Sequence, residues 1–235
     1  MNIIAVKTPV FQEKDNLINF VNNQISSLEE GCVVVIASKI IALSQGRVGE
    51  LKDKNKLIKK NSQKIIKTPW VPLTFVNGEW CINAGIDESN ANNKIILLPK
   101  NPFKVAEYLQ KILKKRFSLK NLGIIITDTK SIPLRVGTIG RTIAYTGFNP
   151  LRSYVGKRDL FGRKNRLTQS NIADALAASA VLVMGEGDEQ TPIVVIKNAL
   201  VEFTNKKNPK KHMNLAHPPE TDIYAYIYNK KMPGG

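Results

Sequence analysis

The sequence is poor in cysteine and histidine, with two of each among 235 residues. Two cysteines are too few for a disulfide framework or a zinc cluster. Cys32 and Cys81 sit in apolar, strand-like segments, so we expect buried thiols in a reducing cytoplasm. His212 and His217 both fall in a polar C-terminal stretch. A Ser-His-Asp catalytic assembly therefore has no credible histidine.

Long apolar runs are also missing. No stretch reaches the roughly 18 apolar residues of a membrane span. The first eleven residues lack the basic start, long apolar core and cleavage site of a secretory signal. The chain has neither a Walker motif nor a G-x-G-x-x-G fingerprint, which argues against P-loop and Rossmann sites. We expect a cytoplasmic protein with no membrane partner.

Acidic residues are outnumbered, with 19 Asp and Glu against 35 Lys and Arg, for a net charge of +16. Such a charge suits either nucleic acid or small anionic substrates. Lysines gather in 52–64, 114–120 and 205–211, without the interleaved aromatic residues of a base-stacking surface. Solvated faces are the simplest explanation for these lysines, and nucleic acid is kept as a less favoured partner.

Apolar patterning predicts strands and helices in irregular alternation. We expect strands over 3–7, 32–43, 94–98, 124–129, 138–148 and 191–197, helices over 15–29, 52–67, 103–116 and 168–184, and a hairpin over 71–84 that turns at Asn77-Gly78. Asp15 is the expected cap of the first helix, and Thr168 or Ser170 that of the last.

This pattern predicts an α/β or mixed α+β fold, with mixed sheets and flanking helices. We place the catalytic domain at residues 1–204, built as one lobe or as two joined lobes. A polar tail follows over 205–235, and its apolar alternation is confined to IYAYIY (223–228).

The segment CINAGIDESN (81–90) concentrates oxygen ligands after an apolar strand. Gly85 permits a tight backbone path, and Asp87 and Asn90 can face one ligand from a turn. Carboxylate oxygens are the ligands that Mg²⁺ and Mn²⁺ prefer. An Asx-rich turn that satisfies its own backbone is the competing interpretation.

The segment IIITDT (124–129) is a buried strand predicted to end in Asp128 and Thr129. Ligand sites in α/β sheets gather at the carboxyl ends of strands. The pair can therefore offer a carboxylate and a hydroxyl to a metal–phosphate complex. A helix cap or turn explains the same residues equally well.

Two further segments carry charge or glycine at suggestive positions. GKRDLFGRKNR (156–166) sets an aspartate among five basic residues, which suits phosphate or carboxylate but also describes a solvated charge run. VLVMGEGDEQTP (181–192) places two glycines between a helix and a strand, where backbone can approach a nucleotide. Glu186 or Asp188 could bind a cation there, although a lone Gly-x-Gly is a weak signal.

Taken together and in order, these segments resemble a known family. The matching segments are ASK (37–39), GR (46–47), NAGIDESN (83–90), LLPKNP (97–102), GIIITDT (123–129), GKRDLFGR (156–163) and ADALAASAVLVMGEGDEQTP (173–192). They are similar to those of the coenzyme F-420-0:L-glutamate ligases, the γ-glutamyl ligases that add glutamate to a deazaflavin cofactor.

The resemblance implies an intertwined homodimer of mixed α/β fold. Its substrates would be GTP, L-glutamate and a cofactor carboxylate, and its ions Mg²⁺ or Mn²⁺ at two sites with a supporting K⁺. The implied catalytic set is Asp87, Asp128 and Arg135, and the implied metal ligands are Asp87, Asp128, Thr129 and Glu186. The implied nucleotide contacts are Pro9, Val10, Phe11, Ser38, Lys39, Asn90, Gly185, Glu186, Gly187, Asp188, Gln190 and Thr191. Candidates to hold the acceptor or glutamate are Asn83, Arg158, Asp159 and Arg163.

The sequence departs from the family pattern at two places. After TDT the family usually has a Gly-Arg pair and then a further arginine. Here Lys130-Ser131-Ile132 follows TDT, the Gly-Arg pair is missing, and Arg135 alone aligns with the family pattern. Leu43 and Gln45 stand where the family has Lys and Glu. These losses touch phosphate and substrate contacts, so a folate γ-glutamyl ligase is an alternative. A non-catalytic nucleotide- or RNA-binding protein and another phosphoryl-transfer enzyme are further hypotheses.

Overall fold

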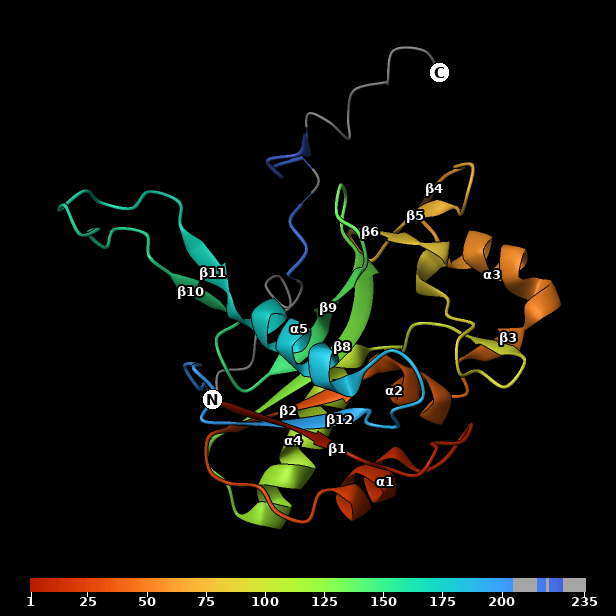
Figure 1. The fold of residues 1–235 in the computed structure, drawn as a ribbon, viewed down its shortest axis with the longest axis horizontal. Coiled ribbons are helices and arrows are strands. Elements are labelled where there is room, and N and C mark those ends of the chain that lie inside the picture. The colour runs from red at the N-terminus through yellow and green to blue at the C-terminus, as the bar shows by residue number, and fades with distance from the viewer. Residues whose placement is uncertain (205–214, 219, 226–235) are drawn as a thin grey trace.

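The computed structural model describes residues 1–204, 215–218 and 220–225. Its centre is a five-stranded sheet with the strand order β1-β12-β2-β8-β9 (Figure 1). The strands are β1 (Asn2–Val6), β2 (Cys32–Ala37), β8 (Leu122–Ser131), β9 (Thr138–Thr146) and β12 (Ile193–Lys197). β2 and β8 run parallel, whereas the other neighbours are antiparallel. The predicted mixed α+β class is confirmed.

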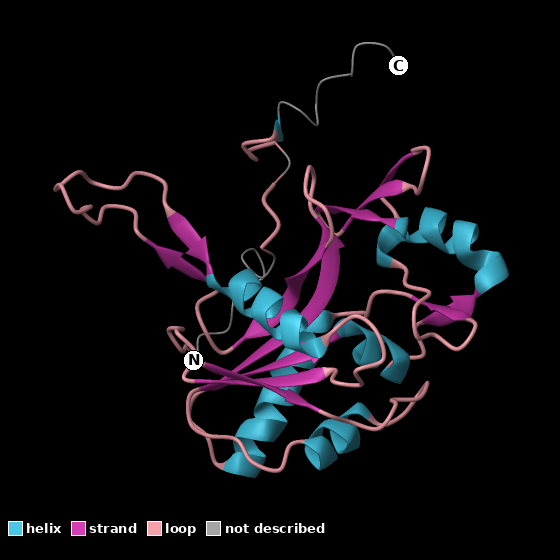
Figure 2. Ribbon diagram, in the orientation of Figure 1, coloured by secondary structure: helices cyan, strands magenta, loops and turns pink. Residues whose placement is uncertain are grey.

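Helices cover both faces of this sheet, as Figure 2 shows. Alternate residues of β2 point to opposite faces, so Val34 and Ile36 enter one core and Val33 and Val35 the other. The first core is closed by α1 (Leu17–Gln24), α2 (Ser38–Ser44) and α4 (Pro102–Phe117), and the second by α5 (Ile172–Met184). Burial on both faces explains why the central strands are apolar throughout.

A smaller lobe lies beside the carboxyl end of β8 (Figure 1). It contains β3 (Val48–Glu50) paired with β7 (Lys94–Ile96), the 3-10 turn η1 (Leu51–Asp53), α3 (Lys54–Asn61), a sheet of β4 (Lys64–Ile66), β5 (Leu73–Val76) and β6 (Glu79–Ile82), and the 3-10 turn η2 (Asn83–Gly85). The predicted hairpin at Asn77-Gly78 is confirmed, since β5 and β6 pair across it. Ile58, Ile86 and Ile95 belong to a separate small core.

A two-stranded arm projects away from the central sheet (Figure 1). It consists of β10 (Leu151–Ser153), β11 (Gln169–Asn171) and the loop between them. β11 leads directly into α5, because Asn171 caps this helix by accepting a hydrogen bond from the backbone N–H of Asp174 at 3.0 Å. The predicted cap at Thr168 or Ser170 is therefore wrong: 169–171 form a strand, and the helix begins later.

Two other predicted elements are shorter than expected. The single strand over 32–43 is wrong, because β2 ends at Ala37 and α2 begins at Ser38. A buried strand and a buried helix both read as continuous apolar sequence. The helix over 52–67 is replaced by α3 and β4.

The first helix also begins later than the sequence predicts. The Oδ1 of Asn16 caps α1, accepting from the N–H of Asn19 at 2.9 Å. The carboxylate of Asp15, the predicted cap, accepts from the N–H of Gln12 instead, at 2.8 Å.

Cys32 is buried and Cys81 is partly exposed, and both are free thiols. The predicted tail and the segment IYAYIY fall largely outside the described residues, as does His212. Among residues 1–204, 215–218 and 220–225, no helix has the length and hydropathy needed to cross a bilayer.

Candidate functional site

The parallel pair β2–β8 positions the first half of the site. The two strands stay in register up to Ala37 and Thr127, and the next residue of each chain segment is polar. The Oγ of Ser38, the first residue of α2, donates to Oδ1 of Asp128 at 3.1 Å. The carboxyl ends of parallel strands thus meet at one edge, where α/β sheets bind ligands. β8 itself does not end at Asp128-Thr129 as predicted, because it continues to Ser131 beside β9.

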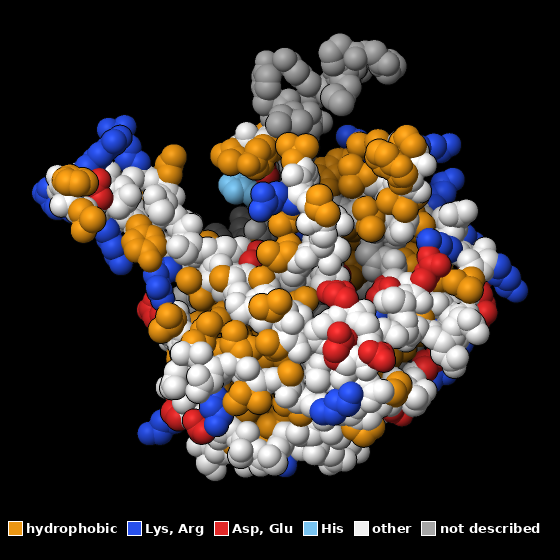
Figure 3. Space-filling view, in the orientation of Figure 1, with side chains coloured by type: hydrophobic (Ala, Val, Ile, Leu, Met, Phe, Trp, Pro, Cys, Tyr) orange, Lys and Arg blue, Asp and Glu red, His pale blue; other side chains and the backbone are white. Residues whose placement is uncertain are grey.

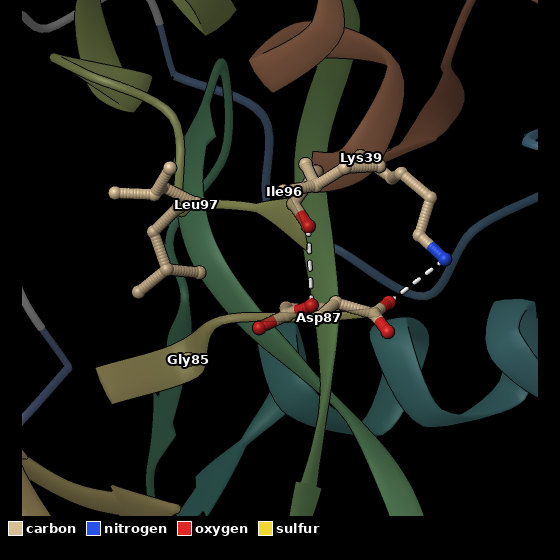
Figure 4. Close-up of a pocket in the computed structure, with 8 residues that line it drawn as sticks. Lys39, Gly85, Asp87, Ile96 and Leu97 are labelled. Carbon is tan, nitrogen blue, oxygen red and sulfur yellow. Dashed lines mark hydrogen bonds and ion pairs between the residues drawn. The ribbon is translucent and has the colours of Figure 1, made fainter. Parts of the chain in front are cut away.

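The smaller lobe supplies Asp87 to the same place. Its backbone N–H and C=O bond with Ile96 at 2.9 and 2.8 Å. Its Oδ2 lies 2.8 Å from Nζ of Lys39 (Figure 4), and its Oδ1 accepts from the N–H of Ser89 at 2.7 Å. Lys39 also donates to the carbonyl and the hydroxyl of Ser89, at 2.9 and 3.0 Å. One lysine therefore ties α2 to the segment that carries Asp87.

A left-handed turn delivers Asp87 to this position. Asn83, Ala84 and Gly85 have φ values of 51°, 57° and 67°, a conformation that is unfavourable for residues with a Cβ. A Cβ at Gly85 would lie 2.7 Å from Cδ1 of Leu98, so glycine is needed for space as well as for φ. Asn83 Oδ1 is buried without a hydrogen-bond partner within the described parts of the chain. Strain of this kind tends to accompany functional sites.

The two halves line a small hollow that opens to solvent. Figure 4 shows the ammonium of Lys39 meeting the carboxylate of Asp87 at this hollow, with Ile96 and Leu97 nearby. The complete lining is Ser38, Lys39, Gly85, Asp87, Ile96, Leu97, Leu98 and Asp128. We call this cavity the site hollow.

The glycine-containing turn 185–191 lies close to the same segment. Nδ2 of Asn90 donates to the carbonyl of Gly187 at 2.8 Å. The carboxylate of Glu189 folds over Gly185, whose φ is 73°, and accepts from the N–H of Gly187 at 2.8 Å. The N–H of Thr8 donates to the carbonyl of Gln190 at 2.9 Å, which brings the loop after β1 alongside the turn.

The acidic side chains have shifted pKa values in both directions. For Asp87, burial works to raise the pKa, but the hydrogen bond and charge of Lys39 outweigh it and the pKa is lowered. Burial raises the pKa of Asp128, and Arg141 and Ser38 only partly oppose this effect. Desolvation also raises the pKa of Glu186, and Asp128 and Asp87 add to the shift by repulsion. The three carboxylates therefore lie within electrostatic reach of one another.

The donor chemistry fits a hard divalent cation. Asp87, Asp128, Thr129 and Glu186 offer only oxygen ligands, as Mg²⁺ and Mn²⁺ require. Within the part of the chain that the structure describes, no three His, Cys, Asp or Glu side chains are grouped closely enough to form a ready metal site. A cation would share Asp87 with the ammonium of Lys39 or displace it. Successive strand residues face opposite sides, so Asp128 and Thr129 do not point the same way.

Not every predicted residue lies at the site hollow. Phe11 is buried in the main core, where its ring packs edge to face with that of Phe20, with 4.8 Å between the ring centroids. Pro9 and Val10 are exposed. Arg135 is exposed in the turn between β8 and β9. That turn lies three ladder pairs beyond Asp128, or about 10 Å at the usual strand rise.

Arg158, Asp159 and Arg163 lie in the loop of the arm, where their hydrogen bonds are local. Asp159 Oδ1 accepts from the N–H groups of Phe161 and Arg163, both at 2.9 Å, and Arg158 donates to the carbonyl of Gly162 at 2.9 Å. Figure 3 shows Lys, Arg and hydrophobic side chains gathered at the end of this arm, away from the main body. Within one chain, these residues do not meet the site hollow.

Several polar residues around the site were missed by the sequence prediction. Glu79 on β6 pairs with Arg141 on β9 and with Lys130 on β8. Glu189 holds the turn at Gly185. The sequence signal for the first pair was a charged residue in each of two strand segments, which favours a charge pair but does not identify the partner.

Comparison with known proteins identifies the family of the chain. Residues 5–198 match the family model described as F420-0:Gamma-glutamyl ligase. The chain is 34% identical to the "Coenzyme F420:L-glutamate ligase" of Methanosarcina mazei, over 83% of this chain and 84% of that protein. The proteins of the same name from Methanocaldococcus jannaschii and Archaeoglobus fulgidus are 33% and 30% identical, over 95% and 80% of this chain and 96% and 84% of their own lengths. The chain belongs to the F420-0:Gamma-glutamyl ligase family of amide-forming enzymes.

Proposed function

We propose that this chain adds L-glutamate to the carboxylate of a coenzyme F420-type acceptor, using GTP and a divalent cation, with K⁺ in support. The observation that carries the proposal is the convergence of Asp87, Asp128 and Glu186 from three distant segments around Lys39. Relatives that cover most of the chain are named for glutamate ligation to coenzyme F420.

The reaction needs activation because a carboxylate is a poor electrophile for an amine. An acceptor oxygen would attack the γ-phosphorus of GTP, and GDP would leave. The glutamate amine would then attack the acyl carbon, with loss of phosphate and one proton. Positioning and charge neutralisation are the protein's main contributions to such a transfer.

The residues of the site suit these contributions. Lys39 supplies a positive charge at the opening of the site hollow, and Ser38 fixes one oxygen of Asp128. Asp87 and Asp128 would hold one divalent ion, and Thr129 and Glu186 a second. Bound metal would neutralise the phosphates during transfer. The turn 185–191, with Asn90 and the exposed residues Pro9 and Val10 beside it, would hold the nucleotide.

A folate acceptor is the second candidate, and the departures from the family pattern favour it. The side-chain amide of Gln45 donates to and accepts from the backbone of Lys100, at 3.0 and 2.7 Å, so part of its hydrogen-bonding capacity is used within the chain. Leu43 packs against the main core. Ile132 is exposed in the β8–β9 turn. At these positions the family has charged residues, whereas this chain has apolar side chains or a side chain bonded within the chain. An acceptor other than the deazaflavin is therefore a specific alternative.

A homodimer is part of the proposal. The arm carries Leu160, Phe161 and Leu167 with side chains 98%, 95% and 89% exposed. Exposed apolar side chains of this size favour an interaction surface. In an intertwined dimer the arm would cross to a second copy, and Arg158 and Arg163 could reach an acidic substrate there.

The direct test is to incubate the purified protein with GTP, Mn²⁺ or Mg²⁺, K⁺ and isotopically labelled glutamate. The deazaflavin coenzyme and tetrahydrofolate are supplied in parallel, and products are weighed by mass spectrometry. Addition of glutamate to the deazaflavin supports the first candidate, and addition to folate alone supports the second. GTP hydrolysis without glutamate transfer would favour another phosphoryl-transfer reaction. No turnover, with salt-sensitive retention of RNA, would favour a binding protein.

A further inference from the structure

One carboxylate, Glu79, holds two cations beside the site. It lies on β6 of the smaller lobe and pairs with Arg141 of β9 and, at 3.2 Å, with Lys130 of β8. The three side chains are between 12% and 28% exposed, so this cluster is largely withdrawn from solvent. Ion pairs so placed are screened less than surface pairs.

Arg141 is also the direct ladder partner of Asp128. Its Nη2 lies 3.9 Å from Oδ2 of Asp128, whereas Oδ1 of the same carboxylate accepts from Ser38 at 3.1 Å. A full arginine–carboxylate hydrogen bond is about 2.7–2.9 Å long. Arg141 is therefore near enough to close on Asp128 but does not do so.

Glu79 contacts the same guanidinium from another side. It engages Nη1 of Arg141 from the side of the smaller lobe, and so fixes the guanidinium between two carboxylates. Arg141 Nε is buried and has no hydrogen-bond partner within the described residues. An unsatisfied buried donor is unfavourable, so this placement is not the one that local hydrogen bonding alone would select.

We propose that Glu79 is a positioning residue that keeps Arg141 off Asp128, and so leaves Oδ2 of Asp128 available to a divalent cation. The inference rests on the proposed role of Asp128 in metal binding. Without the Glu79 carboxylate, Arg141 would close onto Asp128 as a full salt bridge and compete with the cation.

Lys130 fits the same interpretation. It stands in the segment where the chain departs from the family pattern, and it also pairs with Glu79. Lys130 does not substitute for Glu79, because a second cation cannot hold Arg141 in place. Glu79 is the one anion of this cluster. Its removal should therefore change metal affinity more than the removal of either cation.

The test measures Mn²⁺ affinity directly, by electron paramagnetic resonance of free Mn²⁺, in the full chain and its variants. Glu79→Gln should weaken Mn²⁺ binding about 10-fold, as loss of a residue that orients a metal ligand usually does. Arg141→Met should bind Mn²⁺ as the wild type does. Glu79→Gln added to Arg141→Met should have no further effect, because the competing guanidinium is gone.

A matched control is Glu88→Gln. Glu88 follows Asp87 in the sequence, and its carboxylate pairs with Lys54 at the surface. It should leave Mn²⁺ affinity unchanged. Equal weakening by Glu79→Gln in both backgrounds would show a general charge effect and overturn the inference, as would wild-type affinity in Glu79→Gln. Circular dichroism separates misfolded variants, and the double variant tests the idea if either single variant unfolds. A wild-type protein that binds no Mn²⁺ would overturn the metal role in the proposed function and this inference with it.

Discussion

The ammonium of Lys39 and the carboxylate of Asp87 lie 2.8 Å apart, and they belong to different lobes. Lys39 lies in the first turn of the helix after β2, and Asp87 follows the left-handed turn of the smaller lobe. Their side chains are 27% and 44% exposed, so the pair is open to substrate as well as to each other. The contact makes the position of one lobe depend on the other at the site hollow.

Lys39→Ala should abolish most of the activity. The variant removes the positive charge that acts on Asp87 and Glu186. Loss of one preorganised electrostatic group commonly lowers kcat by about 100-fold or more. Steady-state kinetics with GTP as the varied substrate would measure this loss. Lys54→Ala is the matched control, since it breaks the surface pair with Glu88. Control kinetics should equal those of the wild type, and equal kinetics for Lys39→Ala would remove it from the site.

Asp128→Asn should lose nucleotide turnover and gain stability at neutral pH. Burial raises the pKa of Asp128 above its ordinary value of 3.8. The protonated side chain therefore contributes stability that is fully present below the pKa of Asp128 in the unfolded chain, and this stability is lost as the pH rises through the pKa in the folded protein. Asparagine does not ionise, so the variant escapes this loss.

Thermal unfolding at a series of pH values measures the effect of Asp128→Asn. The Tm of the variant minus that of the wild type should increase from about pH 3 to neutral pH. A variant that is less stable than the wild type at neutral pH would contradict the pKa direction. Undiminished ligation by the variant would refute the assignment of Asp128 as a metal ligand.

Gly85→Ala should destabilise the smaller lobe by about 2–4 kcal/mol, from the left-handed φ and the overlap with Leu98 together. Gly156→Ala is the control, because Gly156 has a φ of 79° but open space, with no atom within 4 Å, where its Cβ would lie. That variant should lose only about 1–2 kcal/mol. Urea unfolding curves give both values, and equal losses would show that contact with Leu98 contributes nothing.

Phe161→Asp should shift the protein from dimer to monomer. The variant places a charge on a side chain that is 95% exposed in one chain and that the proposed dimer would cover. Sedimentation equilibrium measures the mass, and Tyr108→Asp, an exposed aromatic on α4, is the control. A Phe161→Asp dimer as stable as that of the wild type would exclude this surface from the interface.

The sequence predicted the parts of the fold that depend on local patterning. The apolar β-branched run at 32–37 and the Asn77-Gly78 turn were sufficient for β2 and the β5–β6 hairpin. The boundary at Ser38 could not be predicted, because strand and helix are both buried there and the apolar pattern does not change.

Of the candidate site, too, only a part could be predicted from the sequence. Motif order predicted Asp87, Asp128 and Glu186 as site residues, and the structure places these three carboxylates within electrostatic reach of one another. The pair of Glu79 and Arg141 depends on where the smaller lobe sits against β9, which no local pattern encodes. Likewise, Arg158 lies on a projecting arm, although its charge alone suggested a place beside substrate.

Helix α5 joins two regions that differ in kind. At its first residue it continues from the arm, and at its last it enters the turn that begins at Gly185. Asp174 anchors its first turn to β9, accepting from the N–H of Thr142 at 2.8 Å. A helix of 13 residues is a stiff rod about 20 Å long. Because Ala173, Ala177 and Ala180 also bury the helix against the central sheet, α5 sets a fixed separation between the arm and the turn that carries Glu186.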